Sequence, residues 1–250
     1  ATGQFGLSIA GAGAIAVNRG APRVEAAVTG STGSHKAQGN GIAVSALNLA
    51  RIYSGVGSAA IAVSASGGTG IAASVAVALA NNKLRAETEA RIAGFATAGA
   101  LSAGTGALSV TASTKSGAEQ LEITAISVAA SIAAAFAGQG GYAVAGAGAD
   151  ARNEISGGTL AELSSITGGV AGSATVTATN AAKISATVAA VSGAVAGSGG
   201  SGGGALSIGA AFTSNRIGTE GEAFATTARV KDAQLTVTGA MSVTAENTAK

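Results

Sequence analysis

The sequence predicts an all-β protein: an elongated β-solenoid whose core is built from alanine, glycine, serine, threonine and valine. Three observations lead to this prediction: a repeat of about 66 residues, strand-like segments within each repeat, and a scarcity of bulky side chains. Aromatic residues make up 3% of the 250 residues and charged residues 10%, whereas glycine fills 40 positions. Stacked strands that pair through their backbones need only small side chains between them.

Two independent anchors mark the repeat. Val-Thr-Ala at 110–112 recurs at 176–178 and 243–245, with a Val-Ser-Ala variant at 44–46, in steps of 66, 66 and 67 residues. The second anchor is an asparagine followed by a basic residue, with Glu-Ala seven residues later: Asn18 with Glu25, Asn82 with Glu89, and Asn215 with Glu222. The third unit departs from this anchor and has Asp-Ala-Arg-Asn-Glu at 150–154 in the matching region.

One shared period predicts one repetitive segment over 1–250 rather than several domains. Its units are 39–105, 106–171 and 172–239, flanked by partial units 1–38 and 240–250. Because the two ends do not complete a unit, we expect a segment of a longer repeat protein, or a subunit that stacks on its neighbours. The glycine-rich breaks at 67–70, 138–141 and 197–204 predict corners. Whether a unit forms one wide coil or several narrow ones stays open.

The charged segment 83–91 fits two secondary structures. Charges at every second position, from Lys83 to Arg91, indicate a half-buried strand. The same residues offer ion pairs at helical spacing, and alanine favours helices. The sister segments 23–29 and 222–227 are richer in β-branched and aromatic residues and lack the ion-pair pattern. Since equivalent units share one fold, the strand is preferred.

Stacking places equivalent residues of successive units in columns. We expect a hydroxyl ladder of Ser45, Thr111, Thr177 and Thr244, and an amide ladder of Asn18, Asn82 and Asn215 at a turn. Glu25, Glu89 and Glu222 form a third predicted column.

The segments Leu-Ser-Ile-Ala-Gly-Ala-Gly-Ala-Ile-Ala-Val-Asn (7–18) and Leu-Ser-Ile-Gly (206–209), each followed by a Glu-Ala strand and a Val-Thr-Ala strand, resemble the repeats of giant bacterial filamentous adhesins. The haemagglutinin-like and leukotoxin-type filamentous adhesins are the named examples. The resemblance covers nearly the whole chain, although its motifs are of low complexity. It implies secretion, an extended β-solenoid stalk at the bacterial cell surface, and a role in attachment or surface coating.

Several kinds of site are disfavoured. The chain has no cysteine and a net charge of +2 without basic clusters, which argues against thiol chemistry and nucleic-acid binding. Its charge-free stretches are broken by glycines, so we expect no transmembrane span. His35 is interpreted as a solvated loop residue, and Gly197, Gly199 and Gly202 as a turn rather than a dinucleotide loop. Asp150 lacks the tandem copies of a calcium-binding repeat.

Two further patterns are explained by ordinary surface structure rather than by a functional site. The pairs Glu87 with Glu89 and Glu220 with Glu222 match the spacing of glycosidase carboxylates, but neighbouring Lys83, Arg85 and Arg91 favour a solvated charge ladder. Alternate threonines at 175–179, and at Thr236 and Thr238, suggest an ice-binding array, although Ser109, Ser113, Ser242 and Glu246 interrupt it in sister units.

The sequence therefore predicts a structural, non-catalytic segment of an exported bacterial filament, stalk or adhesin. We expect no catalytic residue, cofactor or metal. The expected partners are copies of itself or adjacent repeats, with a surface glycan or protein as a further possibility. The alternative is a binding module for ice, glycan or calcium on one face of the same solenoid. An enzyme of the pectin-cleaving kind has the least support, since its aromatic sugar platforms are hard to build from two tyrosines and five phenylalanines.

Overall fold

A computed structural model describes residues 4–30, 35–200, 202–218 and 224–250. Within these ranges the chain is all-β, contains no helix and pairs its strands almost entirely in parallel. The charged segment 83–91 lies inside the long strand β6 (Thr69–Phe95), so the prediction of a strand rather than a helix is confirmed for this segment. None of the described residues forms a helix of the length and apolar character that would cross a membrane.

The described residues form seventeen strands in four sheets. The eight-stranded long sheet holds β1 (Phe5–Gly20), β2 (Arg23–Thr29), β3 (Ala37–Gln38), β6 (Thr69–Phe95), β7 (Leu101–Ser102), β12 (Gly140–Ala171), β15 (Gly203–Ile217) and β16 (Ala225–Val237). The arm sheet holds β5 (Arg51–Ser66), β11 (Glu122–Ala137) and β14 (Lys183–Ser198). The head sheet holds β4 (Ile42–Leu47), β8 (Ala107–Ser113), β13 (Ser173–Asn180) and β17 (Met241–Asn247). A small antiparallel hairpin is formed by β9 (Lys115–Ser116) and β10 (Glu119–Gln120).

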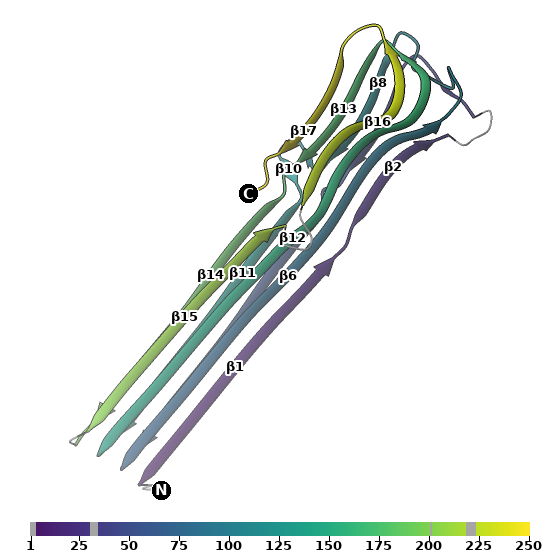
Figure 1. Cartoon of the computed structure of the whole chain (residues 1–250). Helices are drawn as coiled ribbons and strands as arrows, with labels where there is room; N and C mark the ends of the chain where they lie inside the picture. Colours follow the sequence, from purple (N-terminus) through teal and green to yellow (C-terminus); the bar gives the residue numbers. More distant parts are fainter. Residues whose placement is uncertain (1–3, 31–34, 201, 219–223) are drawn as a thin grey trace.

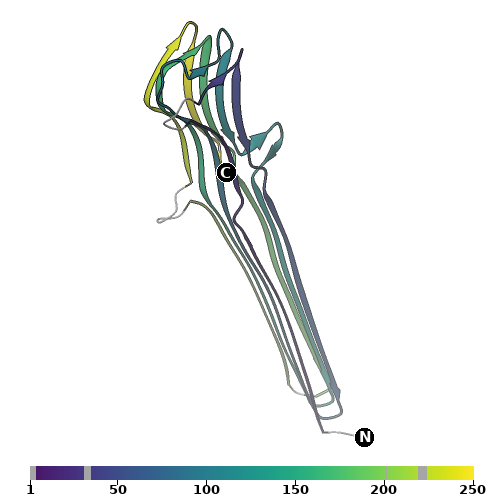
Figure 2. The same ribbon diagram turned by 90° about the vertical axis from the view of Figure 1, so that its right-hand side faces the viewer.

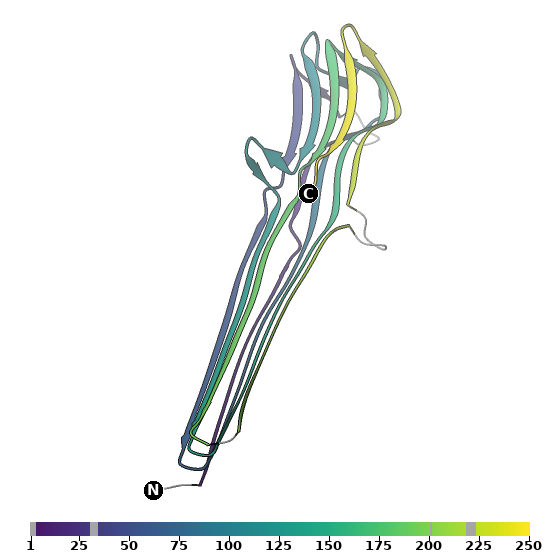
Figure 3. The same cartoon turned by 90° about the vertical axis from the view of Figure 1, so that its left-hand side faces the viewer.

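The molecule has a long, narrow arm and a wider head (Figure 1). We call residues 5–17, 53–79, 124–149 and 185–214 the arm; here the long sheet faces the arm sheet (Figure 2). In the head the long sheet faces the head sheet. The glycine-rich breaks lie at the arm tip, where they join the two layers (Figure 3). At these turns a Cβ on Gly138 would collide with the carbonyl oxygen of Gly67 in the turn before it, so stacking requires glycine there.

The chain makes one long circuit per repeat. It runs out along β1 and β2, returns through β4 and β5, and turns at the arm tip to place Thr69 of β6 beside Phe5 of β1. Gly140 of β12 then lies beside Thr69, and Gly203 of β15 beside Gly141. This winding, with mostly parallel sheets, is compatible with a β-solenoid.

Packing differs between the two ends of the molecule. The arm interior is almost entirely alanine with buried serines. The head core instead contains large side chains, among them Ile92, Phe95, Leu108 and Leu163. The predicted small-residue core is therefore correct for the arm and wrong for the head, where larger side chains fill the space between the long sheet and the head sheet.

Serine hydroxyls show how closely the two sheets of the arm approach. Ser74 of the long sheet donates to the carbonyl of Ala60 in the arm sheet at 2.8 Å, and Ser127 of the arm sheet donates to the carbonyl of Ala78 at 3.0 Å. Ser131 bonds both the carbonyl and the hydroxyl of Ser74 at 2.9 Å. A side chain of two heavy atoms thus reaches the opposite backbone, so the interior of the arm is narrow and holds few side chains larger than alanine or serine, Val56 among them.

Candidate functional site

The most ordered polar feature is an amide ladder that crosses the long sheet where the arm meets the head. Asn18 donates to Asn82, Asn82 to Asn153, and Asn153 to Asn215, each from Nδ2 to Oδ1 at 2.8 Å. Asn82 and Asn153 are buried. The ladder thus unites all three predicted asparagines, but it lies within strands β1, β6, β12 and β15 and faces the interior, so the expectation of a turn is wrong.

Asn153 is the ladder residue that the repeat pattern missed. The spacing between ladder members is 64, 71 and 62 residues rather than a constant period. The excess in the second circuit comes from the β9–β10 hairpin, which projects near the junction of arm and head (Figure 3). Only Asn48 to Ala50 separate β4 from β5, whereas 114–121 separate β8 from β11. Because of this insertion, Asn153 follows Asn82 by 71 residues and does not fit a constant repeat of 66 residues.

A second polar column follows the Val-Thr-Ala strands and was not predicted. It consists of Asn48, Thr114, Asn180 and Asn247, each three residues after the central residue of the anchor. The Thr114 hydroxyl donates to Asn180 Oδ1 at 3.0 Å, and Asn180 Nδ2 donates to Asn247 Oδ1 at 3.1 Å. The constant offset from the anchor was a usable signal in the sequence.

The predicted hydroxyl residues are neighbours on the head sheet. Thr111 is paired with Ser45 on one side and Thr177 on the other, and Thr177 is paired with Thr244. Their side chains face outward, and the hydroxyl of Thr111 contacts that of Ser109 along the same strand, at 3.4 Å.

The threonines considered for ice binding do not share one face. Thr175, Thr177 and Thr179 lie in the head sheet, whereas Thr236 lies in β16 of the long sheet.

The glutamate column is shorter than predicted. Glu25 is paired with Glu89, but the column continues through Leu160 and Thr227, so it loses its charge after two circuits. Glu220 and Glu222 lie outside the described residues.

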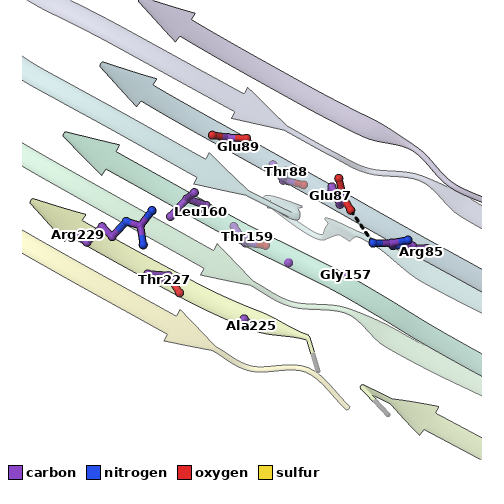
Figure 4. Close-up of a pocket in the computed structure, with 11 residues that line it drawn as sticks. Arg85, Glu87, Thr88, Glu89, Gly157, Thr159, Leu160, Ala225, Thr227 and Arg229 are labelled. Carbon is purple, nitrogen blue, oxygen red and sulfur yellow. Dashed lines mark ion pairs between the residues drawn. The ribbon is translucent and has the colours of Figure 1, made fainter. Parts of the chain in front are cut away.

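The outer face of the long sheet in the head has a shallow depression of about 510 Å³. It lies where Gly157 and Gly158 interrupt the row of side chains between Glu87 of β6 and Ala225 of β16 (Figure 4). Arg85 is ion-paired to Glu87 at 3.2 Å on its rim. Arg229 borders the other side.

Arginines neutralise the carboxylates around this depression. Arg23 lies within 4 Å of Glu25, Glu87 and Glu89. Arg91 pairs with Glu25 at 2.9 Å and with Glu89 at 3.6 Å. Each of these half-exposed ion pairs contributes little to stability. Glu87 and Glu89, the two carboxylates considered for catalysis, both have an arginine partner. The arrangement favours the charge-ladder interpretation of Glu87 and Glu89 over acid–base chemistry.

Glu162 pairs with Arg229 at the edge of the depression. Burial raises its pKa, but the hydrogen bonds from Ser164 and Arg229 and the charge of Arg229 outweigh that effect, so the pKa lies below its ordinary value. A general acid in glycoside hydrolysis needs the opposite shift. Glu162 therefore remains ionised and serves as the anionic partner of Arg229.

The remaining candidates lie apart from this region. His35 is exposed, and Asp150 forms an ion pair with Arg152 at 2.8 Å. Of the glycines interpreted as a turn, Gly199 and Gly202 lie between β14 and β15, whereas Gly197 still belongs to the end of β14. Across the described ranges, no group of three or more histidine, cysteine, aspartate or glutamate side chains is arranged to hold a metal.

Comparison with known proteins adds no identification. No protein-family model, curated protein or solved structure matches the chain. The functional argument therefore depends on the geometry of the sheets and their ladders.

Proposed function

We propose that this chain is a structural repeat segment of an exported bacterial filament, stalk or adhesin, wound as a β-solenoid and acting outside the cell without catalysis. The observation that carries the proposal is the stacking of successive circuits, which is in register over most of the described residues. Val44, Val110, Val176 and Val243 lie side by side in one row, and the buried amide ladder runs across the long sheet.

Such stacking supplies mechanical cohesion. A strand in the middle of the stack, such as β6 or β12, has paired neighbours on both sides over most of its length. Any force that separates two circuits must break a continuous row of backbone hydrogen bonds together with the side-chain ladders. This resistance suits a fibre that must withstand extension and proteolysis.

The two ends of the stack are open. Strands β1, β4 and β5 form one edge, and β14, β15 and β17 form the other. Long unprotected edges are templates for further strands. We therefore expect the partner to be an adjacent repeat or another copy of this chain, which continues the stack.

Electron cryomicroscopy of the purified 250-residue chain tests the proposal. We expect long rods of uniform width with an axial reflection near 4.8 Å, the spacing of strands that lie perpendicular to the axis. Compact particles without that reflection at all concentrations would contradict end-to-end stacking.

A pair of variants sharpens this test. Ala14→Lys places a charge on the inner face of edge strand β1, where it reaches water only while the edge stays open. We expect this variant to abolish the rods. Ser45→Lys, on the outer face of edge strand β4, is the matched control and should leave the rods intact. Rods from both variants would show that the edges are not the contact.

A further inference from the structure

The outer face of the long sheet in the arm is apolar, although it is not covered by the chain itself. We call this surface, formed by β1, β6, β12 and β15 within the arm, the arm face. Its exposed large side chains are Phe5, Leu7, Ile9, Ile15, Val17, Val75, Val77, Tyr142, Val144, Leu206, Ile208 and Phe212. Ile9 is 72% exposed and Val75, on a central strand, is 53% exposed.

Charge is excluded from the same region. The four arm segments 5–17, 53–79, 124–149 and 185–214 contain no aspartate, glutamate, lysine or arginine. Charge enters only the last rows of the arm face, at the junction with the head: Asp150 lies between Leu79 and Phe212, and it forms an ion pair with Arg152. An apolar surface of this extent, bounded by charges on one side, is typical of an interaction site.

Glycines on the arm face have no explanation within the chain. Gly11 and Gly13 of β1, and Gly146 and Gly148 of β12, lie on either side of Val75 and Val77 of β6. A Cβ built on Gly11, Gly13 or Gly148 would meet nothing within 4 Å, and one on Gly146 would only touch Val75 at 3.9 Å. Glycine weakens a strand, and where no turn or crowding requires it, it marks the close approach of another surface.

We propose that the arm face is a self-association surface that takes the arm face of a second copy of this chain. The Val75–Val77 ridge lies between two glycine troughs, so two identical faces have ridges and troughs to interlock. Because the face carries charge only at its head end, where Asp150 and Arg152 neutralise each other, its apolar rows meet no like charge when it packs against itself. This contact is lateral and differs from the end-to-end stacking proposed above.

The area is sufficient for a stable pair. The thirteen residues from Phe5 to Val17 extend about 43 Å, and four strands are roughly 19 Å wide, which gives about 800 Å² per copy. Two such faces bury roughly 1,600 Å², the size of an ordinary specific protein interface.

A lipid bilayer fits the arm face less well. The outer edges of β1 and β15 have backbone N–H and C=O groups without a partner strand. Water satisfies these groups, whereas hydrocarbon does not. A second copy covers the apolar face and leaves those edges free for water or for the end-to-end stacking proposed above.

Sedimentation equilibrium of the 250-residue chain tests the proposal. If the wild-type chain forms rods, Ala14→Lys is introduced into every protein compared, so that end-to-end stacking does not obscure the lateral contact. We expect the mass of two chains at micromolar concentration. Val75→Glu should weaken the pair roughly 100-fold or more, since each pair would bury two unpaired carboxylates. Ile132→Glu is the matched control, because Ile132 is about equally exposed on the central strand of the opposite sheet, and it should leave the mass unchanged.

A steric variant separates packing from charge. Gly148→Leu fills one trough from a position where the Cβ meets nothing within 4 Å of its own chain, and it should also shift the equilibrium to single chains. Circular dichroism checks that each variant keeps its strands. A single-chain mass for the wild type, or equal loss with Ile132→Glu, would overturn the proposal. Flotation of the wild type, but not of Val75→Glu, with phosphatidylcholine vesicles would replace the second copy by lipid.

Discussion

Replacement of Asn82 by alanine is the sharpest test of the amide ladder. Asn82 accepts a hydrogen bond from Asn18 and donates one to Asn153, both at 2.8 Å. It is 1% exposed, so water does not readily take the place of the missing amide. We expect Asn82→Ala to lower the free energy of unfolding substantially.

The magnitude follows from the two bonds. The bond to Asn18 costs about 1 kcal/mol when lost, because Asn18 lies on the open edge strand where water can replace the partner. The bond to Asn153 costs about 2 kcal/mol, because its loss leaves the Oδ1 of a buried residue without a donor. The expected total is therefore about 3 kcal/mol.

Asn81→Ala is the matched control. Asn81 is the preceding residue of the same strand but faces solvent, so the same substitution should change stability by less than about 0.5 kcal/mol. Urea unfolding at neutral pH, followed by far-ultraviolet circular dichroism, measures both values.

A double-mutant cycle between Asn82 and Asn153 isolates the ladder. Once one amide is removed, the other has already lost a partner, so the double variant should be less destabilised than the sum of the single variants by at least about 1 kcal/mol. Additive single costs, or equal costs for Asn82→Ala and Asn81→Ala, would refute the account of a cooperative buried ladder.

Three further predictions concern the arm, the depression and the pH dependence. Ser131→Ala removes both bonds to Ser74 and should cost about 2 kcal/mol in urea unfolding, with no change in strand content. Gly157→Ala should be strongly destabilising, because Gly157 has φ +120° and its Cβ would collide with a neighbouring carbonyl, whereas Gly148→Ala should be neutral or stabilising by up to about 1 kcal/mol. Because the folded pKa of Glu162 is lowered, its ionisation stabilises the fold at neutral pH, and that contribution is lost as the pH falls through the folded pKa. The stability difference between wild type and Glu162→Gln should therefore shrink below the ordinary carboxyl range, and a difference that stays constant from neutral to acid pH would contradict this assignment.

Some features of this protein follow from local patterns in its sequence. Alternation of small and larger residues indicates strands, and the recurring Val-Thr-Ala anchor indicates which segments are equivalent. The head sheet aligns these anchors residue for residue, because no insertion separates them from their neighbours within the strand. The close approach of the arm sheets is likewise expected from alanine-rich alternation.

Other features depend on the tertiary arrangement. The β9–β10 hairpin moves Asn153 out of the 66-residue period, so only strand pairing reveals it as the third ladder member. The large core residues of the head were missed because composition averages the two ends of the molecule.

The arm face illustrates the same division. From the sequence, Val75 and Ala76 are simply adjacent apolar residues in an alternating strand. Which of them is buried depends on the position of the opposite sheet, and that sheet comes from residues of other circuits. The sequence by itself determined the strands and their repetition, because both follow from local side-chain patterns. Only the tertiary structure decided that alanines face inward and most of the larger aliphatic side chains face outward, because two sheets close enough for serine hydroxyls to bridge them leave little space for larger side chains.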